Sequence, residues 1–184
     1  MNKVIITVLG KDRPGIISQV SNILYELGCN LENVNQMILQ SQFAGFFIVD
    51  PPPDKDLEML SQTLIKKTTA SGLSIHVDTI DGGKIGKEPL KGETFLITTI
   101  GPDQKGLVAR FSSIIARHNV NIENLKAVFK GGRDPNANIM SYQVFITQDI
   151  DTAKLFEALR QTAEELDLDI RIQHKNIFNA INKI

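Results

Sequence analysis

The stretch GKDRPG at residues 10–15 decides the fold, because it returns as GPDQKG at residues 101–106. A shift of 91 residues also places NLEN, residues 30–33, on NIEN, residues 121–124. Between residues 4 and 37, ten positions are identical in the two copies without a gap, and most other pairs keep their apolar character. Two polar clusters and an apolar pattern in one register indicate a duplicated module.

Each copy predicts the same order of elements. A short apolar strand ends in glycine, and apolar residues at helical spacing follow it, with Gly28 as a helix stop in the first copy. A hairpin, a second helix and a last strand complete the copy. The first copy has strands 4–9, 31–39, 43–49 and 73–80 and a second helix at 56–71, and the second copy has strands 95–100, 122–129, 139–147 and 169–174 and a helix at 151–166.

This order predicts an α+β fold of two tandem ferredoxin-like βαββαβ domains, each an antiparallel sheet with both helices on one face. We expect domains at residues 1–81 and 93–174, joined by a Gly- and Lys-rich linker at 82–92. The tail, residues 175–184, lies outside the repeat and has Ile177, Phe178, Ile181 and Ile184 at helical spacing. It is either a short helix on the protein's own surface or a helix for a partner.

Composition and charge favour a cytoplasmic protein without nucleic-acid or membrane partners. The 184 residues include 20 basic and 21 acidic side chains, so the basic excess typical of a nucleic-acid binder is absent. No apolar stretch has the length of a membrane span, and the first apolar run is broken at residue 10. The single cysteine, Cys29, lies among apolar residues and is expected to be buried.

The turn between the first strand and the first helix of each copy is the best candidate for ligand binding. A helix N-terminus exposes unpaired N–H groups that attract a carboxylate. Gly15 and Gly106 leave room for a ligand, and Asp12 and Asp103 offer a negative charge to an ammonium group. An α-amino acid carries both charges one carbon apart. The turn could therefore hold its polar head, with Asn30 and Asn121 adding a donor and an acceptor.

A purely structural interpretation of the same residues remains open. Asp12 and Asp103 precede a helix and could be N-caps, with Pro14 in the first helical turn. Duplication would copy a helix cap just as it would copy a binding site. Repetition alone therefore does not distinguish the two interpretations. Glu32 and Glu123 alternate with the buried positions of their strand and are expected to be solvated.

No catalytic or metal-binding constellation is recognisable, and we expect neither enzyme activity nor a cofactor. His76, His118 and His174 lack metal-ligand spacing, and His118 is expected to be a partly buried helical residue. The chain has no phosphate-binding Gly-rich loop, no nucleophile elbow and no Cys-x-x-Cys.

The pattern Gly-x-Asp-Arg-Pro-Gly-Ile-Ile, followed by Gly-Cys-Asn-Leu at 28–31, resembles the ACT domain, a small regulatory module of amino-acid metabolism. The resemblance covers nearly the whole chain except the linker and the tail. Two copies with nothing else attached are similar to the glycine cleavage system transcriptional repressor group. The second copy departs from the pattern, since Lys105 stands where the first has Pro14.

The resemblance implies domains that associate side by side and bind a small amino acid at such interfaces. Together with the residues themselves, it gives this set of candidate ligand-binding positions: Asp12, Arg13, Pro14, Gly15, Ile16, Asn30, Asp103, Gly106, Leu107, Val108 and Asn121. The predicted function is a non-catalytic amino-acid sensor, a homodimer or higher homo-oligomer, which controls amino-acid metabolism, glycine metabolism among the candidates, or its transcription through a protein partner. The alternatives are an interaction scaffold and a regulatory subunit of a metabolic enzyme.

Overall fold

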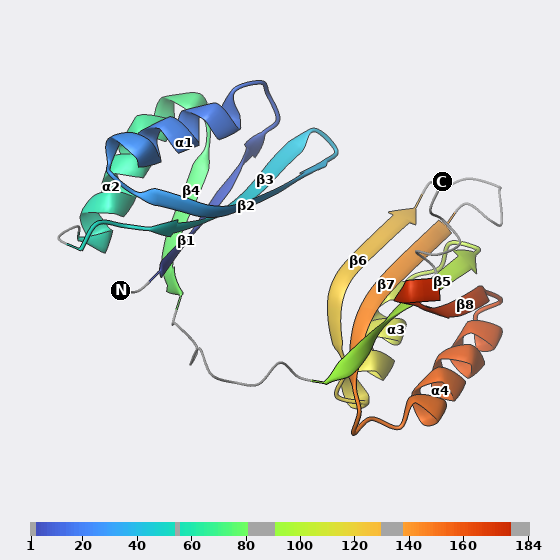
Figure 1. The fold of residues 1–184 in the computed structure, drawn as a ribbon. Coiled ribbons are helices and arrows are strands. Elements are labelled where there is room, and N and C mark those ends of the chain that lie inside the picture. The colour runs from blue at the N-terminus through green and yellow to red at the C-terminus, as the bar shows by residue number, and fades with distance from the viewer. Residues whose placement is uncertain (1–2, 54–55, 81–90, 130–137, 178–184) are drawn as a thin grey trace. The chain divides into compact units, whose positions relative to one another are not determined.

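The chain folds into two compact units, residues 1–87 and 88–184 (Figure 1). The structure is a computed structural model and describes residues 3–53, 56–80, 91–129 and 138–177. Each unit has its own sheet and its own hydrophobic core, and each is described separately below.

The first unit is a four-stranded antiparallel sheet with the strand order β2-β3-β1-β4. Its helices, α1 and α2, lie on one face of that sheet (Figure 1). The elements are β1 (Lys3–Lys11), α1 (Ile16–Glu26), β2 (Asn30–Leu39), β3 (Gln42–Asp50), α2 (Leu57–Thr68), a 3-10 turn (Thr69–Ser71) and β4 (Ser74–Ile80).

The second unit repeats this topology with the strand order β6-β7-β5-β8. Its elements are β5 (Gly92–Gly101), α3 (Leu107–Arg117), β6 (Asn121–Phe129), β7 (Asn138–Thr147), α4 (Thr152–Glu165) and β8 (Asp169–His174). The order βαββαβ in each unit confirms the predicted pair of ferredoxin-like domains.

The two units share the strand register that places their loops. Gly10 lies opposite Phe43 in the first sheet, and Gly101 lies opposite Asn138 in the second. The β2–β3 hairpin turns through Gln40 and Ser41, both with positive φ, as a two-residue turn with the twist of the strands requires. Each first helix ends before a left-handed residue, Gly28 or its counterpart Asn119, so the predicted stop at Gly28 is confirmed.

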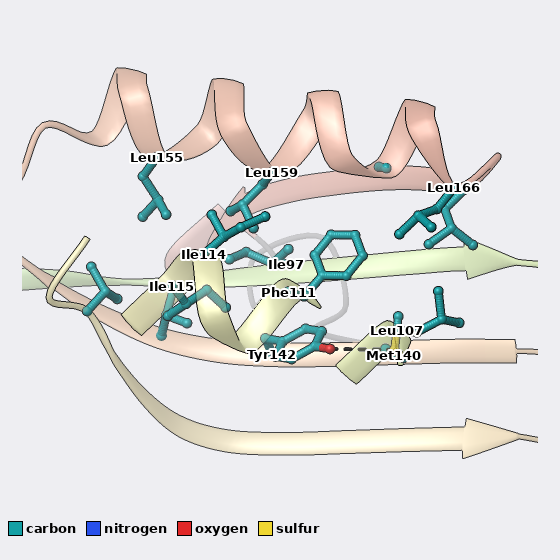
Figure 2. Close-up of a cluster of buried hydrophobic side chains, with 14 of the residues drawn as sticks. Ile97, Leu107, Phe111, Ile114, Ile115, Met140, Tyr142, Leu155, Leu159 and Leu166 are labelled. Carbon is teal, nitrogen blue, oxygen red and sulfur yellow. Dashed lines mark hydrogen bonds between the residues drawn. The ribbon is translucent and has the colours of Figure 1, made fainter. Parts of the chain in front are cut away.

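Each core lies between the sheet and its helices. Alternate residues of β1 and β3 are buried in the first unit, and Cys29 is buried beside them as expected. In the second unit Phe111 of α3 packs near Tyr142 of β7, whose hydroxyl donates to the Met140 sulfur at 3.5 Å (Figure 2). Leu155 and Leu159 of α4 close the same core, and both are fully buried.

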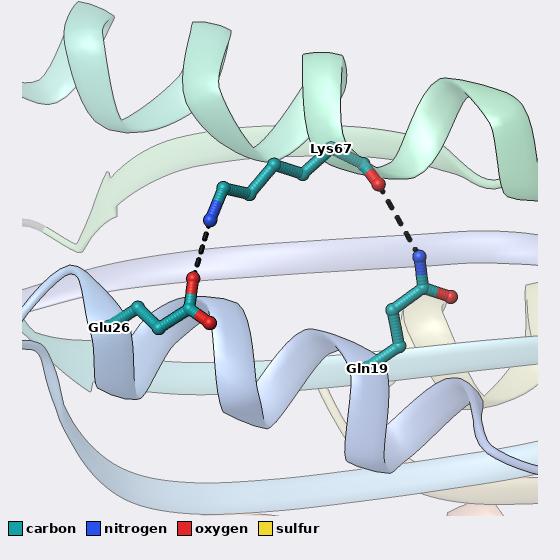
Figure 3. Close-up of polar contacts among 3 residues, drawn as sticks. All are labelled: Gln19, Glu26 and Lys67. Carbon is teal, nitrogen blue, oxygen red and sulfur yellow. Dashed lines mark hydrogen bonds and ion pairs between the residues drawn. The ribbon is translucent and has the colours of Figure 1, made fainter.

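A polar bridge ties the two helices of the first unit together. The Lys67 ammonium lies 2.5 Å from the Glu26 carboxylate, and Gln19 donates to the Lys67 carbonyl at 3.4 Å (Figure 3). The repeat places Arg117 at the position of Glu26, and Arg117 forms no ion pair among the described residues of the second unit. The bridge is therefore particular to the first copy.

Several predicted segments lie partly outside the described residues. The predicted linker, 82–92, is described only at Lys91 and Gly92, and Gly92 begins β5. The predicted tail is described only at residues 175–177, which are helical. Within the described part of the chain, no helix is both long and apolar enough to cross a membrane.

Candidate functional site

The loop between β1 and α1 does not place Asp12 as a helix cap. The backbone N–H of Asp12 donates to the Ser41 carbonyl at 2.9 Å, which fixes the loop on the β2–β3 hairpin. Gly15 is the N-cap residue, with φ 91°, and no side chain caps the helix. The capping interpretation was therefore wrong for Asp12, and Pro14 precedes the helix instead of lying in its first turn.

The second copy adopts the same conformation with a different sequence. Gly106 is the N-cap residue of α3, with φ 85°, and again no side chain caps the helix, so Asp103 is not a cap either. A Cβ added to Gly15 or Gly106 would meet nothing within 4 Å. These glycines therefore allow the backbone to adopt positive φ, and no neighbouring atoms require the absence of a side chain there.

An open groove lies over each loop. In the first copy it measures about 610 Å³ and is lined by loop residues together with Gln36 and Ile38 of β2 and Phe43 of β3. In the second copy it measures about 530 Å³. Nine of the predicted positions line these grooves: Asp12, Arg13, Pro14, Gly15 and Ile16 in the first, and Asp103, Gly106, Leu107 and Val108 in the second.

Not all nine positions offer a side chain to a ligand. Ile16 and Leu107 are buried in their cores, so they can offer only backbone N–H groups. Arg13 donates to Gln19 Oε1 at 2.8 Å and is thus held against α1. Asp12 and Asp103 have no ion-pair partner among the described residues. The carboxylates and the uncapped helix ends are therefore the charged groups left for a ligand.

The structure does not bring Asn30 or Asn121 to these loops within a unit. Asn30 lies opposite Asp50 at one end of the β2–β3 pair, whereas the Asp12 loop follows the other end, where Lys11 lies opposite Gln42. The strand between them has 10 residues, which corresponds to about 30 Å. One small ligand cannot touch Asp12 and Asn30 of the same unit.

The repeated Asn-x-Glu-Asn cluster forms a β-bulge at the edge of each sheet. The register shifts between Leu31 and Asn33 in the first unit and at the corresponding place in the second. Glu32 lies exposed at the bulge, 2.8 Å from the Lys3 ammonium, and this contact raises the pKa of Lys3. Glu123 is also exposed and accepts from Gln143 at 2.9 Å. The expected solvation of both glutamates is confirmed, and a bulge explains why the cluster repeats.

The histidines lie apart on three elements. His118 is half-buried at the end of α3 with Nδ1 2.9 Å from the Ile114 carbonyl, as expected for a helical residue. His174 of β8 packs edge-on against the Phe95 ring at 5.3 Å. Within the described residues, no three side chains of His, Cys, Asp or Glu gather in a way that could hold a metal ion.

Sequence reasoning missed the hairpin residues that form one wall of the first groove, Gln36, Ile38 and Phe43. The signal was present in the predicted hairpin, because its turn at 40–42 lies beside the end of β1. Pairing the strands would have placed Phe43 opposite Gly10. In the second copy, Gln104 donates to the Leu166 carbonyl at 2.5 Å and anchors the loop to the end of α4.

The chain is thus a duplicated ferredoxin-like protein, with an uncapped helix after the first strand of each copy. The family model for the ACT domain matches residues 2–78 and 93–173, and the chain therefore belongs to the ACT domain family, with two tandem copies. It is an ACT-domain regulatory protein.

Relatives match one copy at a time. The chain is 35% identical over 89 residues to the UPF0237 protein of Methanopyrus kandleri, covering 48% of this chain and 96% of that protein. It is 40% identical over 75 residues to a UPF0237 protein of Streptococcus mutans, covering 41% of this chain and 81% of that protein. The relatives are thus about half as long as this chain.

Two solved structures share the tandem fold. An unknown protein from Galdieria sulphuraria is similar with a TM-score of 0.75 and 20% identity, covering 94% of this chain and 98% of that one. A structure described as a "putative glycine cleavage system transcriptional repressor" is similar with a TM-score of 0.69 and 17% identity, covering 94% and 96%. At these identities the likeness establishes the fold alone.

Proposed function

We propose that this protein is an amino-acid sensor that binds a small amino acid at its Gly-x-Asp loops and controls amino-acid metabolism, or its transcription, through a protein partner. The observation that carries the proposal is the same in both copies. An uncapped helix N-terminus opens into a groove beside an aspartate that forms no ion pair with any residue the structure describes.

The two groups match the two charges of an α-amino acid. The first-turn N–H groups of α1 or α3 would bind the carboxylate, because they lack intrahelical acceptors and carry the positive end of the helix dipole. Asp12 or Asp103 would bind the ammonium group by a charge-assisted hydrogen bond. The balance of 20 basic and 21 acidic residues favours a protein partner over direct contact with DNA.

A second copy of the chain would bring Asn30 to the loop. β2 is an edge strand, and its exposed apolar residues, Leu31, Val34, Met37, Ile38 and Leu39, leave it open to pairing. Antiparallel pairing of two β2 strands would place Asn30 of one copy beside Leu39 of the other, next to the Asp12 loop. A ligand between the copies would then stabilise the pair, which is how a sensor shifts an equilibrium.

Calorimetric titration of the full chain with the twenty amino acids tests the proposal. Glycine and serine are the first candidates, because one protein of the same fold is described as a glycine cleavage repressor. We expect Asp12→Ala and Asp103→Ala each to weaken binding at its own loop at least about tenfold, and the double variant to show no binding. Asp78→Ala, at the far end of the sheet from the loop, is the matched control and should bind as the wild type does.

The second candidate is an interaction scaffold, and the exposed β2 edge favours it. A scaffold would self-associate to the same extent with and without amino acids, which sedimentation velocity measures directly. If none of the twenty amino acids binds and the chain self-associates equally with and without them, the scaffold is the correct function and the sensor is wrong.

A further inference from the structure

The helices of the second unit form a groove between α3 and α4. Its volume is about 740 Å³, which exceeds that of either loop groove. Arg110, Ser113 and Arg117 of α3 line one side, and Thr162 and Glu165 of α4 line the other. Both arginines are exposed, and neither forms an ion pair within the described part of the chain. Two guanidinium groups therefore line one groove without a paired anion.

The first copy shows what these positions can reach. The repeat places Gln19 at the position of Arg110 and Glu26 at the position of Arg117. Both side chains contact Lys67 of α2: Glu26 meets its ammonium at 2.5 Å, and Gln19 donates to its backbone carbonyl at 3.4 Å (Figure 3). Two positions of the first helix thus converge on the two ends of one residue across the groove.

The second copy keeps these positions but not the bridge. The N-cap aspartates of α2 and α4 align at a shift of 95 residues, which places Thr162 at the position of Lys67. A threonine is too short to cross the groove, and it carries no charge. Arg110 and Arg117 therefore lie on the flank of α3 next to α4, where the carboxylate and the ammonium of the first copy have no counterpart.

One acidic side chain also lines the groove. Glu165, the last residue of α4, forms no ion pair with either arginine among the described contacts. The described lining therefore carries two positive charges and one negative charge, which still attracts an anion. Because the groove is open to solvent, this attraction should weaken as the salt concentration rises.

We propose that the α3–α4 groove binds a small anion with two phosphate or carboxylate groups, one held by Arg110 and the other by Arg117. A guanidinium presents paired donors that match the oxygens of either group, and it stays charged at any physiological pH. The Thr162 hydroxyl can donate a further hydrogen bond. Neither arginine lines a loop groove, so this site is independent of the amino-acid sites of the proposed function.

The spacing of the arginines favours an anion with two charged ends. Arg110 and Arg117 are seven residues apart on α3, which corresponds to about 10 Å along the helix axis. In the first copy, the side chains at these positions bind separate groups of Lys67 instead of one shared atom. A single phosphate or carboxylate would therefore satisfy one guanidinium and leave the other unpaired.

Calorimetric titration of the full chain at constant ionic strength tests the site. Pyrophosphate is compared with phosphate, and succinate with acetate, because the members of each pair differ in the number of charged groups. We expect at least one anion with two groups to bind with a Kd of about 1 mM or below, and about tenfold or more tightly than its partner with one group. The pair that shows the difference identifies the ligand group as phosphate or carboxylate.

Substitution of either arginine should remove most of this binding. Arg110→Gln and Arg117→Gln should each weaken the anion with two groups about tenfold or more, because charge-assisted hydrogen bonds are lost. Arg160→Gln is the matched control, since it removes an exposed positive charge from α4 of the same unit but lies outside this groove. It should bind the anion as the wild type does.

The triple variant Arg110→Gln/Arg117→Glu/Thr162→Lys builds the bridge of the first copy into the second unit and should not bind the anion. Equal weakening in Arg160→Gln, or undiminished binding in the arginine variants, overturns the inference. Undiminished binding is the result expected if the anion lies at the uncapped helix N-termini of the loops instead. Absence of binding by all four anions overturns the inference as well, and the amino-acid titration remains a separate test of the proposed function.

Discussion

Gly106→Ala isolates the energetic role of the left-handed residue that begins α3. Gly106 has φ 85°, and a Cβ at this position would meet nothing within 4 Å. The substitution therefore adds no clash and changes only the backbone energy. An L-residue in the left-handed region costs about 1–2 kcal/mol. The lower chain entropy of the unfolded alanine variant offsets about 0.4–1 kcal/mol of that.

The net expected loss is about 1 kcal/mol of unfolding free energy. With an m value of about 2 kcal/mol/M in urea, the midpoint should fall by about 0.5 M with an unchanged slope. Fluorescence of Tyr142 is a suitable probe, because this buried residue belongs to the second core and the chain has no Trp. A Tyr25→Phe background removes the other tyrosine, which is 82% exposed on α1.

Gly106→Asn is the matched control, because asparagine tolerates the left-handed region better than alanine does. It should lose clearly less stability than Gly106→Ala, although its side chain is larger. Gly101→Ala is the opposite case, in which the added Cβ meets a steric clash. It would lie 2.6 Å from Leu168 Cδ2 and 3.0 Å from the Asp167 carbonyl oxygen. Wild-type stability in Gly106→Ala, or an equal loss in the alanine and asparagine variants, would refute the backbone argument.

Three further outcomes are expected from urea unfolding. Burial raises the pKa of Tyr142 to about 12 from 10.0, so the unfolded chain loses this proton first as the pH rises. The free energy of unfolding should therefore fall by about 2 kcal/mol from pH 10 to 12, and Tyr142→Phe should lack that fall. Asp56→Ala should cost about 1 kcal/mol, because Asp56 caps α2 at the Glu58 N–H, whereas an equal loss in Asp12→Ala would contradict the uncapped loop. Leu159→Ala should cost about 2–5 kcal/mol and Leu159→Met clearly less, since Leu159 is fully buried.

The fold could be predicted because the duplication tests every local pattern twice. Strand, turn and helix signals that are weak in one copy recur 91 residues later, and both copies specify the same topology. The loop residues became candidates for the same reason. The repeated glycine marks a backbone that needs positive φ, and the repeated aspartate lies beside it.

The rest of the site depends on strand pairing, which residue spacing does not determine. Asn30 looked like part of the loop site, but the hairpin register carries it to the other end of the sheet. The same register places Phe43, expected in a strand, opposite Gly10, and Asn138, expected outside the strand at 139–147, opposite Gly101. A bulge also accounts for a polar cluster that spacing alone suggested was functional.

Positions 43 and 138 show how one duplicated frame carries different side chains at the same register position, opposite Gly10 and Gly101. The loop backbone is constrained in both copies, because positive φ at Gly15 and Gly106 favours glycine at the start of the helix. The residue at the end of the neighbouring strand carries no such constraint, so its polarity can change without moving the loop. The Asn138 amide and the Thr99 hydroxyl are buried without a hydrogen-bond partner among the described residues. Each unpaired atom costs about 1–3 kcal/mol, and apolar residues at the same positions of the first unit avoid that cost.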